Sequence, residues 1–137
     1  MGIMMRSKRI DLQVVSETLQ EKCPFITFAL LGGTDKHGFL CDGEKIELSV
    51  FVIPGTVTWD AIENILRAMT PAVPGIFCEV TLLNHVDPGT RHHAMQDTCL
   101  FIQKGMEKVF YDFSQRSSLD YRIMRAQQRR NGLNGQD

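Results

Sequence analysis

The sequence predicts one α/β (α+β) domain, in which a small mixed sheet of about four strands is flanked by helices. Amphipathic helical patterns alternate with short strand-like patterns along the chain. The length of 137 residues suits a single core. No long Gly-, Pro- or Ser-rich linker divides the sequence.

The first half of the chain predicts a helix, two strands and a second helix. Residues 10–23 place apolar side chains at helical spacing. Residues 25–31 are apolar on both alternating faces, which is typical of a strand covered on both sides. After a loop rich in Gly, Asp and Lys, residues 45–53 alternate, with apolar side chains at the even positions. Thr58 as N-cap and Pro71 as the end bound the second predicted helix.

The second half predicts two more strands and two more helices. Residues 76–83 alternate as a third strand. Asp87 followed by Pro88 marks the start of a short helix, since Asp caps helices and Pro favours their first position. Residues 98–102 form a fourth predicted strand, and a long final helix begins near Met106.

Composition and charge argue against several classes of protein. The net charge of −1 gives no electrostatic case for direct nucleic-acid binding. The apolar stretches are too short to cross a bilayer, and no signal-peptide pattern follows the start. The four cysteines are far apart without a Cys-x-x-Cys, which argues against a zinc site or a disulfide framework. We therefore expect a cytoplasmic protein that does not enter a membrane.

The C-terminal part of the chain is basic. Residues 1–130 form the expected domain, and residues 131–137 are polar enough to predict a disordered tail. The sequence leaves open whether the basic side chains are simply solvated, bind a partner or face RNA. These side chains are Arg116, Arg122, Arg125, Arg129 and Arg130.

The segment that begins at Gly33 carries the most informative motif. A Gly33-Thr34 pair is followed by Gly38 and, on the alternating strand, by Lys45 and Glu47. A glycine turn brings backbone N–H groups and a hydroxyl close to a triphosphate. Side chains two residues apart on a strand share a face, so acids at such positions can hold a divalent metal for nucleotidyl transfer.

This segment resembles the signature of the minimal nucleotidyltransferases of the polymerase-beta superfamily. That signature is Gly-Ser, a short basic stretch, a second Gly, a loop and Asp-x-Asp on a strand. Gly33 and Thr34 fall on the Gly-Ser pair, while Lys45 and Glu47 fall on the two aspartates without a gap. The resemblance implies a nucleotidyltransferase-like fold, and Mg²⁺ and ATP as cofactors if the protein is active.

The resemblance also implies roles for individual residues. Glu79, on the polar face of the third strand, falls on the third acid of the family, so it should converge with Lys45 and Glu47. Glu47 and Glu79 would be the catalytic and metal-binding acids, with Asp42 as a further metal ligand from the loop. The implied nucleotide-binding residues are Gly33, Thr34, Gly38 and Lys45.

The sequence departs from the signature at its most important position. Lys45 replaces the first metal-binding acid, and an ammonium group cannot ligate a metal ion and repels it. Glu47 and Glu79 are each one methylene longer than Asp, which displaces a catalytic carboxylate. We therefore expect impaired catalytic acids, and the sequence alone leaves open whether the protein is an enzyme.

Three hypotheses about function follow. Small stand-alone domains of this kind look like antitoxins whose partner is a helical HEPN protein, so the first hypothesis is an antitoxin-type interaction protein with ATP binding left open. The alternative is an active Mg²⁺-dependent enzyme that moves AMP from ATP to a partner protein. The third is a binding or assembly module without a nucleotide site or cofactor, which could form a homo-oligomer.

Overall fold

The computed structural model describes residues 8–41 and 45–134. The order of its elements agrees with the sequence prediction, with one short 3-10 helix (η1) added. In chain order they are α1 (Leu12–Lys22), β1 (Ile26–Gly32), β2 (Lys45–Val52), α2 (Thr58–Ala72), β3 (Phe77–Leu82), η1 (Leu83–His85), α3 (Pro88–Ala94), β4 (Thr98–Ile102) and α4 (Glu107–Asn134).

The four strands form one mixed sheet with the order β3-β2-β1-β4. Strand β1 runs antiparallel to both β2 and β4, whereas β3 runs parallel to β2. Because a parallel pair needs a crossover connection, the chain passes through α2 between β2 and β3. The predicted small mixed sheet is confirmed.

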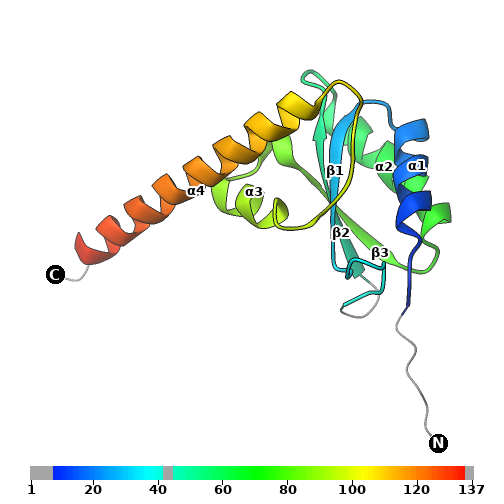
Figure 1. Cartoon of the computed structure of the whole chain (residues 1–137), viewed down its shortest axis with the longest axis horizontal. Helices are drawn as coiled ribbons and strands as arrows, with labels where there is room; N and C mark the ends of the chain where they lie inside the picture. The colour runs from blue at the N-terminus through cyan, green and yellow to red at the C-terminus, as the bar shows by residue number, and fades with distance from the viewer. Residues whose placement is uncertain (1–7, 42–44, 135–137) are drawn as a thin grey trace, which may run out of the picture.

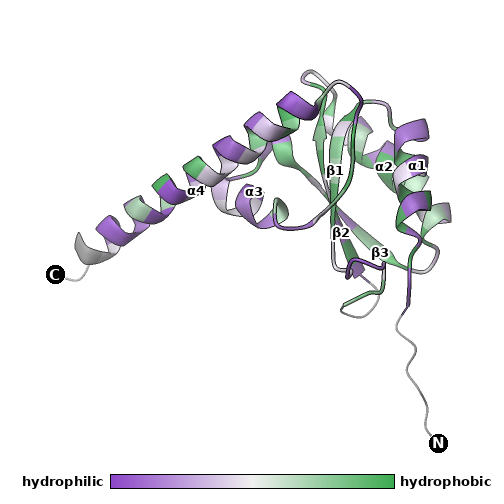
Figure 2. Cartoon of the chain, viewed as in Figure 1, coloured by the Kyte–Doolittle hydropathy of each residue, from purple (hydrophilic) through white to green (hydrophobic). Residues whose placement is uncertain are grey.

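Helices cover both faces of this sheet (Figure 1). Helices α1 and α2 lie over one face, and α3 and α4 lie over the other. All seven residues of β1 are buried, as expected for a strand covered on both sides. Figure 2 shows hydrophobic residues concentrated on the strands and hydrophilic ones over much of α4.

Two separate cores result from this arrangement. In the larger core, the even-numbered apolar residues of β2 pack against α1 and α2. Val15 and Leu19 of α1 and Ile65 of α2 are part of this core. The smaller core centres on Phe28 on the opposite face. The Phe28 ring lies 5.3 Å from that of Phe51 and 4.9 Å from that of Phe110, measured between ring centroids. Phe28 thus joins the start of α4 to the sheet.

Each end of α2 lies one residue away from its predicted place. The helix begins with Thr58 itself, and its N-cap Val57 makes no side-chain hydrogen bond. Pro71 lies inside the last turn, and the helix ends one residue later at Ala72. A proline this close to the end removes only one N–H donor, and the Val73 N–H still reaches the Met69 carbonyl at 2.9 Å.

Helix α4 is longer than the sequence suggests. It runs to Asn134 and so includes four residues of the segment predicted as a tail. Its first two thirds contain the contacts with α3, where the Arg91 guanidinium lies 3.2 Å from the Asp120 carboxylate and the His92 ring stacks on Tyr121. None of the helices in the described part of the chain is long and apolar enough to cross a membrane.

Removal of the Phe28 ring tests the smaller core. Phe28→Ala should lower the free energy of unfolding by about 3–5 kcal/mol, since it deletes a fully buried ring that contacts other aromatic rings. Urea denaturation followed by circular dichroism measures this loss. Phe39→Ala is the matched control, because Phe39 is 41% exposed and its loss should cost much less. Equal losses for the two variants would contradict the assignment of this core.

Candidate functional site

The loop after β1 brings the two motif glycines into places that exclude a side chain. Gly33 has a φ of 91°, and a Cβ there would lie 2.9 Å from the Lys45 carbonyl oxygen. Gly38 has a φ of 92°, and a Cβ there would collide with the Ile10 carbonyl oxygen. Both positions need glycine because of the positive φ and the close backbone. The glycine turn is therefore held directly against the beginning of β2.

Asp35 holds the loop in shape. Its carboxylate accepts hydrogen bonds from the N–H groups of His37 at 2.8 Å and Phe39 at 3.0 Å. Desolvation acts to raise the pKa of Asp35, but these hydrogen bonds outweigh it and the net pKa is lowered. Asp35 thus has a structural role in the turn. Asp42, predicted as a metal ligand, lies outside the described residues.

Thr34 offers an unused polar atom beside this turn. Its Oγ1 is buried and has no hydrogen-bond partner among residues 8–41 and 45–134. A buried hydroxyl without a partner costs free energy, so a bound ligand that accepted its proton would relieve that cost. The role of Thr34 in holding a phosphate group stays a prediction.

The structure brings Lys45, Glu47 and Glu79 together on one face of the sheet, as the sequence predicts. Glu47 and Glu79 are direct partners in the parallel register of β2 and β3. The Lys45 ammonium lies 2.7 Å from the Glu79 carboxylate and 3.8 Å from the Glu47 carboxylate. About half of each side chain is exposed, at 49%, 48% and 51% for Lys45, Glu47 and Glu79. We call these three residues the charged trio.

The Lys45 ammonium offsets part of the repulsion between the Glu47 and Glu79 carboxylates, which the strand register places side by side. Like charges directly opposite on neighbouring strands destabilise a sheet, and Glu47 and Glu79 are such a pair. The hydrogen bond and the charge of Glu79 raise the pKa of Lys45; desolvation opposes the rise, and Glu47 adds to it. Lys45 therefore stays protonated at neutral pH, and the trio carries a net charge of −1 (+1 − 2).

A magnesium ion does not fit the trio in this arrangement. Mg²⁺ requires oxygen ligands in near-octahedral geometry, and Lys45 offers none and places its own charge between the two glutamates. Within the described ranges, no group of three or more His, Cys, Asp or Glu side chains is placed to hold a metal ion. The proposed metal ligands Glu47 and Glu79 are thus close together, but Lys45 pairs with both.

Sequence reasoning missed Asp97, which lies close to the same end of the sheet. A Cβ on Gly32 would come 2.6 Å from the Asp97 carboxylate, so the glycine leaves room for that side chain. Gly32 is the strand partner of Glu47. Partial burial raises the pKa of Asp97; His93 acts to lower it, and the charge of Glu47 acts to raise it. The sequence carries only a weak signal for the position of Asp97, because that position depends on the absence of a side chain at Gly32 in β1.

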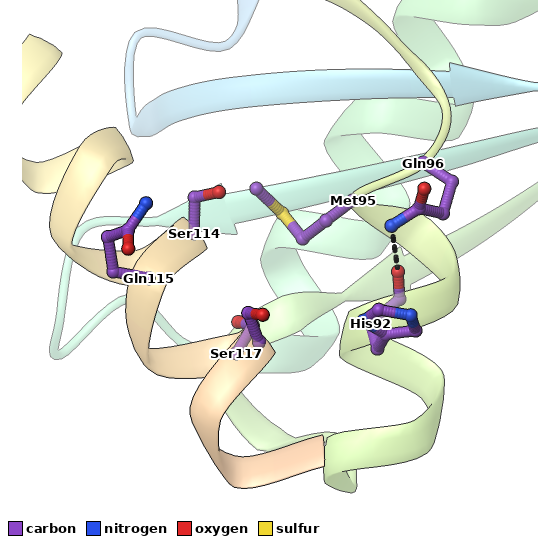
Figure 3. A pocket seen from close by; sticks show the side chains of 7 residues that line it. His92, Met95, Gln96, Ser114, Gln115 and Ser117 are labelled. Carbon is purple, nitrogen blue, oxygen red and sulfur yellow. Dashed lines mark hydrogen bonds between the residues drawn. The ribbon is translucent and has the colours of Figure 1, made fainter. Parts of the chain in front are cut away.

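A separate hollow of about 230 Å³ lies between α3 and α4 (Figure 3). Its lining is mostly neutral and polar, and inside it the Gln96 side chain donates a hydrogen bond to the His92 carbonyl oxygen at 3.4 Å. None of the site residues predicted from the sequence lines this hollow. The charged trio with the glycine turn is therefore the candidate site.

Comparison with solved structures supports the predicted nucleotidyltransferase-like fold. A chain of an MntA–HepT toxin–antitoxin variant, with two aspartates replaced by glutamates, matches with a TM-score of 0.70 and 12% identity, over 93% of this chain and 100% of that chain. A toxin–antitoxin structure with AMP-PNP gives 0.69 and 12%, with the same coverage. The MntA–HepT structure gives 0.57 and 10%, over 92% of this chain and 97% of that chain.

The likeness is structural, since no family model and no curated protein sequence matches the chain. Identities of 10–12% establish the fold alone. The mixed four-stranded sheet with helices on both faces agrees with these neighbours over nearly the whole chain. The chain therefore has the fold of a minimal nucleotidyltransferase domain, as its glycine and strand motif predicts.

Proposed function

We propose that this protein is a cytoplasmic, nucleotidyltransferase-like protein with impaired catalytic acids, which acts mainly through a protein partner. The observation that carries the proposal is the position of the Lys45 ammonium, 2.7 Å from Glu79 and 3.8 Å from Glu47. The family signature requires a metal-binding acid at this position. An ammonium group held by the remaining acids satisfies part of their charge and opposes the entry of a divalent cation.

The same ammonium group could bind a triphosphate without a metal ion. A lysine ammonium has three N–H donors, and Lys45 is half-exposed. The Gly33 turn lies against the Lys45 backbone, and the nearby Thr34 hydroxyl has no hydrogen-bond partner in the described part of the chain. Backbone N–H groups, a hydroxyl and an ammonium are common phosphate ligands. ATP would therefore bind through these groups independently of Mg²⁺.

The partner that we propose is a helical toxin of the HEPN type. The matched structures are toxin–antitoxin structures, and this chain covers 97–100% of the matched chains. The likeness thus extends over nearly the whole of one chain in those structures. An antitoxin that works by complex formation needs a stable fold and a binding surface, and it can tolerate a damaged catalytic site.

An active Mg²⁺-dependent nucleotidyltransferase is the second candidate. Glu47 and Glu79 retain two of the three family acids, and Asp97 lies close enough for the charge of Glu47 to influence it. This candidate requires Lys45 to leave the two glutamates so that they become free to bind metal. Transfer of labelled AMP from ATP to the partner protein would favour it over the first proposal.

Calorimetric titration of ATP should give the same affinity in Mg²⁺ and in EDTA. Lys45→Met should weaken that binding about tenfold, or roughly 1.4 kcal/mol, because it removes the charge that meets the phosphates. Lys104→Met is a matched control, since this exposed lysine follows β4 at the opposite end of the sheet. Binding that requires Mg²⁺ would instead favour the active enzyme, and no binding would favour a module without a nucleotide site.

A second substitution asks whether Lys45 alone excludes the metal. Lys45→Asp places three carboxylates where the charged trio stands, so this variant should bind Mn²⁺ in an electron paramagnetic resonance titration and the wild type should not. Lys45→Met separates the loss of the lysine from the gain of an acid, and urea denaturation checks that each variant folds. Equal Mn²⁺ binding by the wild type and Lys45→Asp would show that Lys45 does not block the site.

A further inference from the structure

Helix α4 presents two different faces along its length. One face packs against α3 and the sheet, and its residues are buried or half-buried: Phe110, Phe113, Ser117, Tyr121 and Met124. Beyond this contact the helix continues into solvent, and residues 125–132 are all exposed. Figure 1 shows α4 projecting from the body of the domain toward the C-terminus.

The opposite face of α4 carries an apolar stripe in a heptad pattern. Leu119 and Ile123 are each 48% exposed, and Ala126 follows on the next turn. Arg116 and Arg130 continue the alternating spacing of three and four residues at either end, as at the a and d positions of a coiled coil. We call these five residues the α4 seam. A shallow hollow of about 370 Å³ lies along the seam beside Arg116 and Leu119.

Basic side chains flank this seam. Arg122 and Arg129 directly precede Ile123 and Arg130, which puts them at the g positions that pair across a coiled coil. The segment 121–134 contains four arginines and no acidic residue. Two acidic side chains lie on or next to this face, and both are already paired. Asp112 lies 3.2 Å from the Lys108 ammonium, and Asp120 lies 3.2 Å from the Arg91 guanidinium and 3.8 Å from that of Arg116. Arg122 and Arg129 therefore leave positive charge that an acidic partner would complement.

We infer that the α4 seam binds a helix of a partner protein whose own apolar stripe is flanked by Asp or Glu. This inference rests on the proposed function, in which the protein acts through a helical partner, and it names the surface and the chemistry of the contact. Leu119 and Ile123 bury their exposed area in the interface, and Arg122 and Arg129 pair with the acidic flanks.

Charge disfavours two other occupants of the seam. A second copy in parallel would place Arg130 against Arg130, and an antiparallel copy would bring Arg122 toward Arg129. Both arrangements set like charges together, which costs binding free energy. RNA would use the arginines on every side of the helix and would gain little from Leu119 and Ile123.

A synthetic peptide tests the inference with the full chain. The probe is a fluorescent helix of about three heptads with Ile at a, Leu at d and Glu at e and g; a matched peptide carries Lys at e and g. Fluorescence anisotropy should show preferred binding of the Glu peptide. Ile123→Glu should weaken that binding at least about tenfold, and the pair Arg122→Glu and Arg129→Glu should reverse the preference.

Arg125→Glu supplies the matched control. It makes the same charge change as Arg122→Glu but lies at a c position, off the seam, so Glu-peptide affinity should stay within about twofold. Equal losses at Arg125 and Arg122 with none at Ile123, and tight binding of a single-stranded RNA oligomer, would overturn the inference in favour of RNA. A wild-type dimer in light scattering that Ile123→Glu abolishes would overturn it in favour of a second copy.

Absence of any preference between the two peptides would also overturn it. Circular dichroism establishes that each variant keeps its helices. The outcome is separable from that of the proposed function, because none of these substitutions touches the charged trio and the ATP titration does not involve α4. A negative peptide result with Mg²⁺-independent ATP binding would reject the seam alone.

Discussion

Strand β1 has no residue exposed to solvent, and burial of both its faces requires a helical layer on each side of the sheet. In the larger core, α1 and α2 cover one face of the strand. In the smaller core, the aromatic rings around Phe28 cover the other face and pack the start of α4 on the sheet. The same strand ends at Gly32, directly before Gly33, at the end of the sheet where the candidate site lies. Packing and site geometry thus depend on one buried strand.

The candidate site holds two facing carboxylates on neighbouring strands beside an ammonium group. The parallel register places Glu47 opposite Glu79, an arrangement that suits two ligands of a shared cation and is unfavourable without one. Lys45 supplies that cation from within the strand. A single side chain therefore offsets part of the repulsion that a shared metal ion would otherwise offset.

Much of the fold could be predicted from the sequence because burial has a simple period in strands and helices. The alternation in residues 45–53 assigned both faces of β2, and the bounds of β4 agreed with the apolar run at residues 98–102. The convergence of Lys45, Glu47 and Glu79 followed from the same alternation with the family signature. Their ion pairs did not follow, because distances depend on the register of β3 on β2.

Other features depended on contacts that no local pattern records. Asp97 approaches the site because β4 pairs with β1 and Gly32 has no side chain. The start of α2 at Thr58 and the place of Pro71 inside its last turn depend on the backbone at the helix ends. The length of α4 escaped prediction because polar, Gly-containing composition is also typical of disordered tails.

The anchoring of α4 near one end makes the helix a lever. Its 28 residues span about 42 Å at the usual rise per residue, and its contacts with α3 and the sheet lie in its first two thirds. A change of about 10° in the packing angle at Ser117 would move the far end by about 4 Å, close to the spacing of successive Cα atoms. Small adjustments between α3 and α4 are therefore magnified at the C-terminal end of the helix.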